Sequence, residues 1–308
     1  MSYSSNLTNH NPSKYQTNAS FVYSAANSSP VLDLLDAQPG EKIIDLGCGT
    51  GQLTIQLQGI VCVGEGGEVV GVDSNESMLE SARQSLKQAS SHRIKFIQAD
   101  IQNFPSFASK HPELEGHFDK VFTSATLHWC KSNPGGVVEL VKWLLKPGGK
   151  FAFEFGGFGN VVGIRAALHQ SLKSRGMNPI PLDPWYFPTD KQYQKLLDSK
   201  GFTTDAECIK LVPRPTPLPT NLKGWLETFA RNSFLSTLSD EDAQSVLDEV
   251  VQICRVDNYW SDAHPGSGIN PRSDSESNDK DKDKDKGDMR EGWEVMYVRL
   301  RGIAIKPQ

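Results

Sequence analysis

The chain has 308 residues, of which 37% are hydrophobic and 22% are charged, and its formal net charge at pH 7 is −5. This length suits one large globular domain or two modest ones. The acidic balance argues against a general nucleic-acid binder, which needs a basic surface. No apolar run approaches the roughly 20 residues that cross a bilayer, so no membrane partner is expected.

The cysteines and the N-terminus indicate the cellular compartment. The five cysteines are odd in number, widely scattered and without a CxxC pair, which predicts neither a disulfide framework nor a metal site. The N-terminus has no basic segment followed by an apolar one, so a signal peptide is not expected. We therefore expect a cytoplasmic protein without a metal. A monomer is favoured, with the oligomeric state left open.

The first half of the chain predicts alternating strands and helices. Residues 1–14 are polar and are expected to be a disordered leader, and residues 15–35 are expected to be partly helical. The five strands that follow are predicted at 42–46, 68–73, 94–98, 118–124 and 150–155. Helical apolar spacing lies between them, for example at 76–89. This alternation predicts a parallel sheet with helices on both faces.

The alternation stops after the fifth strand. Residues 156–200 contain a predicted helix, a proline-rich stretch and a second helix, and we interpret this segment as a helical cap inserted over the carboxyl ends of the strands. Residues 201–308 are expected to complete the sheet with a strand at 202–212, two helices and a last strand near 296–301. Residues 261–290, between the second of these helices and the last strand, are of low complexity and are expected to be a disordered loop.

The most informative segment is the turn after the first strand. Residues 43–51 read IIDLGCGTG, in which an apolar strand ends in an acid and three alternating glycines open a helix. The spacing differs from the G-x-G-x-x-G dinucleotide fingerprint, and no basic residue lies in the loop. A second acid, Asp73, ends the next strand and suits a ribose diol. The pattern favours a cationic adenosine derivative over a pyrophosphate.

Five segments in order carry a resemblance to a known family. They are DLGCGTG at 45–51, VDSNESML at 72–79, FIQADI at 96–101, FDKVFTSATLHW at 118–129 and LKPGGKF at 145–151. The chain resembles the class I methyltransferases that use S-adenosylmethionine (SAM). This resemblance implies an α/β fold with a Rossmann-like, doubly wound, seven-stranded sheet of order 3-2-1-4-5-7-6, whose last strand is antiparallel.

The same resemblance implies an enzyme of class EC 2.1.1.- with SAM as cofactor. The implied cofactor-binding residues are Asp45, Gly47, Cys48, Gly49, Thr50, Gly51, Asp73, Ser74, Met78, Asp100, Ile101, Thr123 and Ser124. In this assignment Asp45 holds the ammonium group or orients the loop. Asp73 binds the ribose hydroxyls, and Asp100 with Ile101 flanks the adenine. Thr123 and Ser124 border the methyl group.

The acceptor of the methyl group is expected to be a small molecule. The sequence lacks the motif of the amino-methylating nucleic-acid enzymes after the fourth strand, and it lacks the paired glutamates of arginine methyltransferases and the acidic magnesium ligands of catechol enzymes. Residues 125–129 and the C-terminal layout are most similar to trans-aconitate methyltransferase and its relatives, which esterify carboxylates. An arginine would help to hold such a substrate, and the candidates are Arg165, Arg231 and Arg299.

Other roles stay open at this point. His128 is the candidate catalytic residue, as a base for a hydroxyl substrate, but a structural role beside Trp129 is favoured. The expected substrate-binding residues are Trp129, Trp185 and Tyr186. Two alternatives remain: a hydroxyl O-methyltransferase of secondary metabolism, and a catalytically silent SAM-binding regulatory protein.

Overall fold

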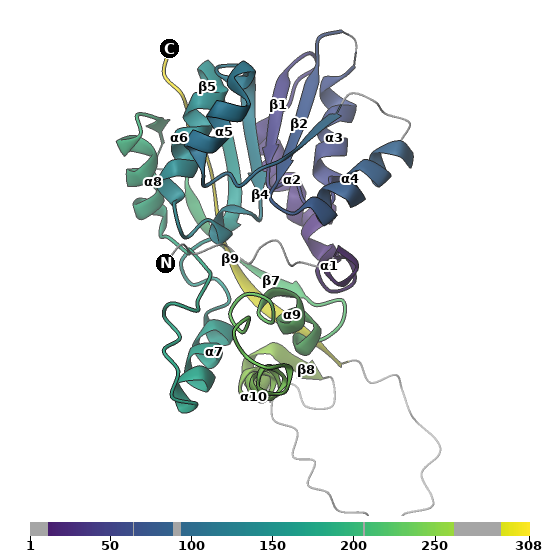
Figure 1. Ribbon diagram of the computed structural model, residues 1–308, viewed down its shortest axis with the longest axis vertical. Coiled ribbons are helices and arrows are strands. Elements are labelled where there is room, and N and C mark those ends of the chain that lie inside the picture. Colours follow the sequence, from purple (N-terminus) through teal and green to yellow (C-terminus); the bar gives the residue numbers. More distant parts are fainter. Residues whose placement is uncertain (1–11, 64, 89–93, 206, 262–290) are drawn as a thin grey trace, which may run out of the picture.

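The computed structural model describes residues 12–63, 65–88, 94–205, 207–261 and 291–308 (Figure 1). Its strands are β1 (Lys42–Leu46), β2 (Glu68–Asp73), β3 (Ile94–Gln98), β4 (Phe118–Ser124), β5 (Leu145–Gly156), β6 (Thr203–Thr204), β7 (Lys210–Pro217), β8 (Tyr259–Ser261) and β9 (Glu291–Ile305). Its α-helices are α1 (Pro12–Ala19), α2 (Ala25–Leu35), α3 (Gln52–Val61), α4 (Glu76–Gln88), α5 (Phe104–Lys110), α6 (Pro134–Leu144), α7 (Val162–Ser174), α8 (Asp190–Ser199), α9 (Leu222–Phe229) and α10 (Asp240–Asn258). Short 3-10 helices are η2 (Ser20–Tyr23), η3 (Pro112–Leu114) and η4 (Leu127–Trp129).

Within the described residues the strands form one nine-stranded sheet, whose main path is β3-β2-β1-β4-β5-β9-β6. Strands β1 to β5 pair in parallel, whereas β9 runs antiparallel to β5, β6, β7 and β8. The predicted order 3-2-1-4-5-7-6 with an antiparallel last strand is therefore confirmed. Strand β9 is the one that was predicted as the seventh strand.

Two strands were not predicted. The single strand expected at 202–212 is divided into β6 and β7, and β8 was missed altogether. Strand β7 carries prolines at 213, 215 and 217, which cannot donate ladder hydrogen bonds. It tolerates them because it pairs with β9 alone and is an edge strand. The fifth strand, predicted at 150–155, begins earlier in the structure, at Leu145, and its pairing with β4 shifts register between Phe118 and Lys120.

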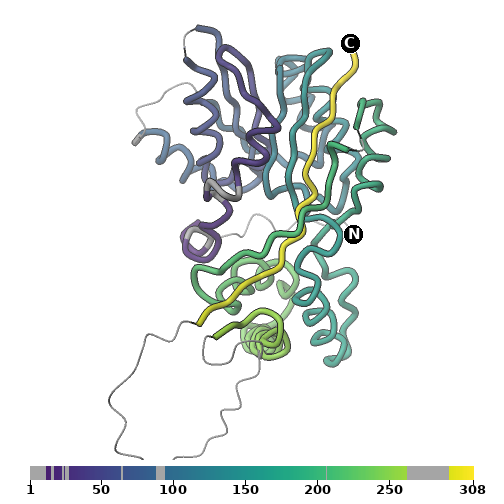
Figure 2. The backbone as a smooth tube through the Cα atoms, turned by 180° about the vertical axis from the view of Figure 1, so that it is seen from behind, coloured from purple at the N-terminus to yellow at the C-terminus, as the bar shows by residue number. Residues whose placement is uncertain are grey.

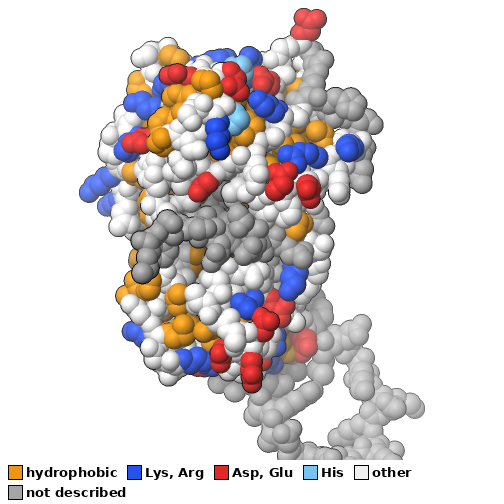
Figure 3. Space-filling model, in the orientation of Figure 1, with side chains coloured by type: hydrophobic (Ala, Val, Ile, Leu, Met, Phe, Trp, Pro, Cys, Tyr) orange, Lys and Arg blue, Asp and Glu red, His pale blue; other side chains and the backbone are white. Residues whose placement is uncertain are grey.

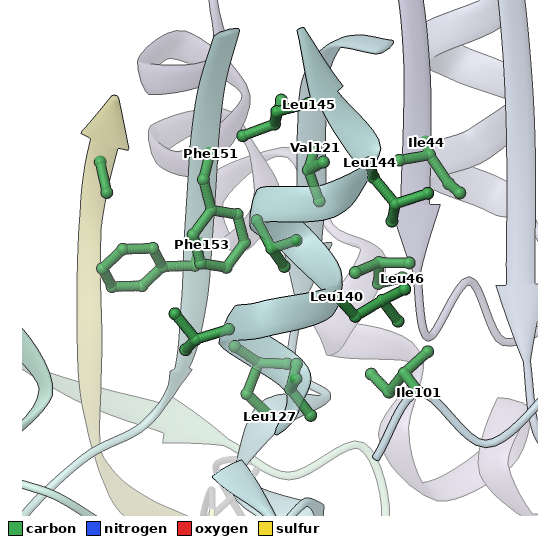
Figure 4. Packing of buried hydrophobic residues seen from close by; sticks show 14 of the residues in the cluster. Ile44, Leu46, Ile101, Val121, Leu127, Leu140, Leu144, Leu145, Phe151 and Phe153 are labelled. Atoms are coloured by element: carbon green, nitrogen blue, oxygen red, sulfur yellow. The ribbon is translucent and has the colours of Figure 1, made fainter. Parts of the chain in front are cut away.

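The sheet is covered on both faces, as the alternation predicts. In β1, Ile44 and Leu46 point toward α6, where Leu140 and Leu144 contact them (Figure 4). Ile43, which precedes Ile44, packs in a different cluster, with side chains of α2 and α3. Because successive side chains of a strand point to opposite faces, these two clusters define the two layers of helices around the sheet.

A second hydrophobic core lies beyond the sheet. It combines residues of α7, α9 and α10 with Val295 and Tyr297 of β9. Farther along the same strand, Leu300 and Ala304 belong to the main core. Figure 2 shows β9 running beside β7 from the smaller part of the molecule into the larger one. This strand therefore joins the two cores.

The segment 156–200, predicted as one cap, is divided by the packing. Helix α7 joins the second core, but α8 packs on the main core through Tyr193 and Leu197. The capping box of Thr189 and Gln192 starts α8 and sets its direction. Helices α9 and α10, predicted as C-terminal helices, pack in the same second core as α7.

The predicted ends of two segments need correction. Helix α1 begins at Pro12, within the range expected to be a disordered leader, because proline suits the first turn of a helix. Residues 1–11 lie outside the described residues. Ser261 ends β8, and the rest of the loop predicted at 261–290 also lies outside them. The division of the chain into a core at 15–155 and a C-terminal part at 201–308 stays a prediction.

The surface carries charges of both signs. On the face shown in Figure 3, acidic and basic side chains are interspersed.

Across the described ranges, no helix combines the length and the apolar character required to span a membrane.

We predict that the second core contributes substantially to stability. Replacing Leu247 of α10, which is 1% exposed, by alanine should lower the free energy of unfolding by about 3 kcal/mol, because a cavity replaces buried methyl groups. Ile253→Ala on the same helix is the control, since Ile253 is 45% exposed. Urea denaturation followed by circular dichroism measures both. Equal losses for the two variants would contradict this description of the core.

Candidate functional site

The loop between β1 and α3 is built on glycines in left-handed conformations. The φ angles are 78° at Gly47, 55° at Gly49 and 82° at Gly51. A Cβ atom on Gly47 would lie 2.2 Å from the side chain of Thr126, and one on Gly51 would lie 2.9 Å from the Cβ of Ala82. Glycine alone meets both the conformation and the space. The loop is thus held closely between α4 and the residues that follow β4.

Asp45 lies near the end of β1 and is 2% exposed. Its Oδ2 accepts a hydrogen bond of 2.7 Å from Oγ1 of Thr54. Burial raises the pKa of Asp45 to about 7; the bond from Thr54 opposes this rise and repulsion from Asp73 adds to it. A cationic group of a ligand would favour the ionised form, so this carboxyl is suited to bind an ammonium group.

Asp73 connects the end of β2 with the glycine loop. Its Oδ2 accepts a bond from the backbone N–H of Gly49, and its Oδ1 accepts one from Asn75, both at 2.9 Å. Burial raises the pKa of Asp73, and these backbone hydrogen bonds oppose the rise. Each oxygen retains acceptor capacity for a ligand hydroxyl.

These groups line a pocket at the carboxyl ends of β1, β2 and β4, where ligands bind in open α/β sheets. Of the predicted cofactor residues, ten line it, namely Asp45, Gly47, Cys48, Gly49, Asp73, Ser74, Met78, Asp100, Ile101 and Ser124. No lysine, arginine or histidine among the described residues lines this first pocket.

Three of the predicted cofactor residues lie outside the pocket lining. Thr50 is fully buried and its hydroxyl bonds to Gln52, whereas Gly51 packs against α4. Thr123 is also fully buried, and its Oγ1 donates to the carbonyl of Leu46 at 2.7 Å. These residues support the loop and the sheet from behind.

Sequence reasoning missed ten residues that line the first pocket, which are Val22, Leu53, Val72, Asn75, Ala99, Gln102, Ala125, Thr126, Cys130 and Phe229. Several adjoin the predicted motifs, so proximity in sequence could have found them. Val22 of η2 and Phe229 of α9 come from distant elements, and an apolar residue of a helix gives no signal that separates a pocket wall from ordinary core.

A second, smaller pocket adjoins the first. Val22, Ala125, Trp129 and Phe229 line both pockets and mark the junction between them. Ala125 has a left-handed φ of 58°, and its N–H donates to the carbonyl of Glu154 at 2.7 Å. This conformation, uncommon for a residue with a side chain, turns the chain at the end of β4 between the two pockets.

His128 lines the second pocket, but its geometry does not suit a general base. Its Nδ1 accepts a hydrogen bond of 3.2 Å from the N–H of Gly156. Burial lowers its pKa well below the usual value, and the charge of Arg299 acts in the same direction. The ring is therefore neutral with its proton on Nε2. This state suits a hydrogen-bond donor better than a base and agrees with the favoured structural role, while the catalytic role of His128 stays a prediction.

The predicted substrate residues behave differently from one another. Trp129 and Trp185 both line the second pocket, with ring centroids 6.1 Å apart. Tyr186 lines neither pocket; its N–H donates to the carbonyl of His128, and its ring packs against the main core. The structure thus gives Tyr186 no place in the pocket wall.

The three candidate arginines are distinguished by their partners. Arg165 is bonded to buried Asp183, with Nε and Oδ2 2.6 Å apart, and Arg231 pairs with Asp240 at 2.5 Å. Arg299 lines the second pocket and is 3% exposed, and its Nε finds no hydrogen-bond partner. Its guanidinium carbon lies 4.6 Å from the ring centroid of Tyr297.

Within the described part of the chain, no group of three or more His, Cys, Asp or Glu residues is arranged to hold a metal ion.

Comparison with known proteins identifies the family. A model of the methyltransferase domain matches residues 37–174. A methyltransferase of Schizosaccharomyces pombe, C70.08c, whose function is uncharacterized, is 30% identical over 256 residues, which cover 80% of this chain and 91% of that protein. The chain belongs to the class I SAM-dependent methyltransferases.

Two further similarities support this assignment. The trans-aconitate 2-methyltransferase of Deinococcus radiodurans is 28% identical to this chain over 265 residues. The match covers 77% of this chain and 87% of the Deinococcus protein. The solved structure of the BH2331 protein of Bacillus halodurans has a TM-score of 0.58 at 14% identity, covers 92% of this chain, and thus shows the same fold. The predicted family, enzyme class EC 2.1.1.- and cofactor are confirmed.

The first pocket of this methyltransferase fits SAM. The glycine loop leaves a space that a Cβ would fill, and the polar lining contains three aspartates without a basic side chain from the described residues. Such a set suits a ligand with a positive charge and hydroxyl groups, and disfavours a phosphate. When bound, SAM supplies a methyl group activated by a positively charged sulfur.

We predict that Gly47→Ala weakens SAM binding by at least roughly tenfold, because the new Cβ would displace Thr126 and strain the loop. The control is Gly59→Ala in α3, where a Cβ would meet nothing within 4 Å. Isothermal titration calorimetry with SAM measures both, and thermal unfolding shows whether each variant folds. Unchanged affinity in Gly47→Ala would contradict the role of this close contact.

Proposed function

We propose that this protein transfers a methyl group from SAM to the carboxylate of a small molecule. The observation that carries the proposal is Arg299, a buried guanidinium in the second pocket whose Nε has no hydrogen-bond partner. A buried charge without a counter-ion is costly. A carboxylate offers two oxygens that match the guanidinium fork and would offset this cost.

The roles proposed for the cofactor residues follow from the first pocket. Asp45 binds the ammonium group, and Asp73 accepts hydrogen bonds from the ribose hydroxyls. Asp100, whose Oδ1 already accepts a bond from the N–H of Gln102 at 2.9 Å, flanks the adenine together with Ile101. Ser124, the last residue of β4, lines the first pocket and precedes Ala125, which lines both pockets.

The second pocket supports a carboxylate over a hydroxyl acceptor. A carboxylate is ionised at neutral pH and needs no base, whereas a hydroxyl does. His128 uses Nδ1 to accept a bond, and burial raises the pKa of Tyr297 to about 12, so neither is a base near pH 7. No aspartate or glutamate among the described residues lines this pocket. The chain therefore contributes mainly position and exclusion of water.

The relatives are consistent with this proposal. The Deinococcus radiodurans protein is named for methylation of trans-aconitate, a carboxylic acid. A small molecule as substrate also agrees with a second pocket enclosed by side chains of η2, α9 and β9. The cytoplasmic location and the monomeric state remain predictions.

The test is methyl transfer from isotopically labelled SAM to a panel of carboxylic acids and matched alcohols. We expect base-labile methyl esters of acids. Arg299→Gln should raise the KM for an acid by roughly tenfold or more, because a charge-assisted hydrogen bond is lost. The affinity for SAM should be unchanged. Arg231→Gln, which removes a charge outside both pockets, is the control.

Label found on alcohols alone would contradict the proposal and favour a hydroxyl O-methyltransferase. Binding of SAM without transfer to any acid, including the acid fraction of a cell extract, would favour a silent SAM-binding protein.

We also predict a pH dependence of SAM binding. Because burial raises the pKa of Asp45 to about 7, this carboxyl is neutral at lower pH and loses its attraction for an ammonium group. Affinity should fall by up to about tenfold for each pH unit below 7 and level off above it. Calorimetric titrations between about pH 5.5 and 8 measure this. Asp45→Asn should bind weakly with a flatter profile, and an equal slope in both proteins would exclude Asp45 as the titrating group.

A further inference from the structure

The second pocket combines a single positive group with an aromatic wall. From this combination we infer that the substrate is a flat, apolar acid with one carboxylate, rather than an acid with several. This inference rests on the proposed carboxylate methylation and specifies its substrate class.

The polar groups of the pocket can all donate hydrogen bonds. The proton of neutral His128 is on Nε2, because Nδ1 accepts from Gly156. Asn160 is 4% exposed, and its Oδ1 accepts a bond of 2.9 Å from the N–H of Val298, so its Nδ2 group is left to donate. With the guanidinium of Arg299, these two groups complete a set of donors. An ionised carboxylate, which only accepts hydrogen bonds, matches such a set.

The pocket has one positive charge to offer. Two other arginines of this sheet region are held by Glu154, which is 2% exposed: Arg214 lies 3.1 Å and Arg301 2.5 Å from its oxygens. Neither of them lines the pocket, and Arg299 is its one lysine or arginine among the described residues. A second or third carboxylate of a polyacid would therefore be buried without a counter-ion, which is strongly unfavourable.

The rest of the wall is aromatic. Six rings line the pocket, those of Trp129, Trp185, Phe187, Trp225, Phe229 and Tyr297. Trp185 and Phe187 are stacked, with an interplanar angle of 18° and centroids 5.7 Å apart.

The polar atoms of this wall are partly used within it. The Nε1 of Trp225 donates to the hydroxyl of Tyr297 at 2.5 Å. The wall therefore presents mainly ring faces and edges, which favour a flat hydrocarbon or aromatic body.

The experiment compares acids of matched size with the full chain and labelled SAM. The flat monocarboxylates are trans-cinnamate and 2-naphthoate, the polyacids are trans-aconitate and tricarballylate, and cinnamyl alcohol is the hydroxyl control. We expect kcat/KM to be at least roughly tenfold higher for the flat acids. Burial of one uncompensated charge would weaken binding of a polyacid by more than this factor. Preference for the polyacids would overturn the inference and leave carboxylate methylation standing. Transfer to the alcohol alone would overturn the proposed function itself.

Two variants test the wall and the donors separately. Phe187→Leu should raise the KM for cinnamate several-fold with little change in kcat, whereas Phe158→Leu, at a residue that is 62% exposed and outside the pocket, should not. Asn160→Asp places an acid in the same pocket as the guanidinium and should lower the use of every acid by roughly tenfold or more. SAM affinity and thermal unfolding serve as folding controls. An unchanged KM in both pocket variants would overturn the inference.

Discussion

The fifteen-residue strand β9, which joins the two hydrophobic cores, is the constraint on which the second pocket depends. It is paired with β5 in the main sheet and with β7 at the edge, and its side chains enter two separate hydrophobic cores. Because side chains alternate along a strand, Tyr297, Arg299 and Arg301 share one face. The pairing with β5 places Arg301 opposite Glu154, and Arg299, two residues earlier, reaches the second pocket. A shift of one residue in this register would turn the guanidinium into the opposite core.

On this face of the sheet, buried and half-buried positive charges outnumber buried negative ones. One buried carboxylate, Glu154, serves two guanidiniums, and the third guanidinium is buried without an ion pair to any described residue. A protein under selection for stability alone has no use for such a group, since an apolar residue of similar volume would cost less. The arrangement has a physical reason if the missing counter-ion arrives with the substrate. The guanidinium is then already removed from water in the folded protein, so substrate binding does not have to desolvate it.

Local patterns in the sequence singled out ten of the residues that line the first pocket, and their roles toward SAM stay predictions. The glycine loop, Asp73 and Asp100 were found because each is tied to the end of a strand, and the order of the strands is fixed by handed connections. The residues of the second pocket were harder to predict from the sequence. The difference between Arg299 and Arg165 lies in whether a carboxylate sits nearby in space, which no periodicity records. The state of His128 in η4 depends on the N–H of Gly156, the last residue of β5, which is remote in the sequence. The edge strand β7 was misjudged because its prolines break the usual strand signal.

The chemistry that this pocket favours also follows from its polarity. Transfer of a methyl group from a sulfonium to a carboxylate neutralises two opposite charges, so water stabilises the separated reactants more than the transition state. Aromatic rings that exclude water therefore favour the reaction. The lone guanidinium contributes to substrate binding rather than to the transfer step itself. It binds the ionised acid firmly, but the methyl ester carries no charge and accepts weaker hydrogen bonds. Arg299 would thus hold the substrate more tightly than the product, and release of the ester would be assisted by the cation that the fold leaves without a partner.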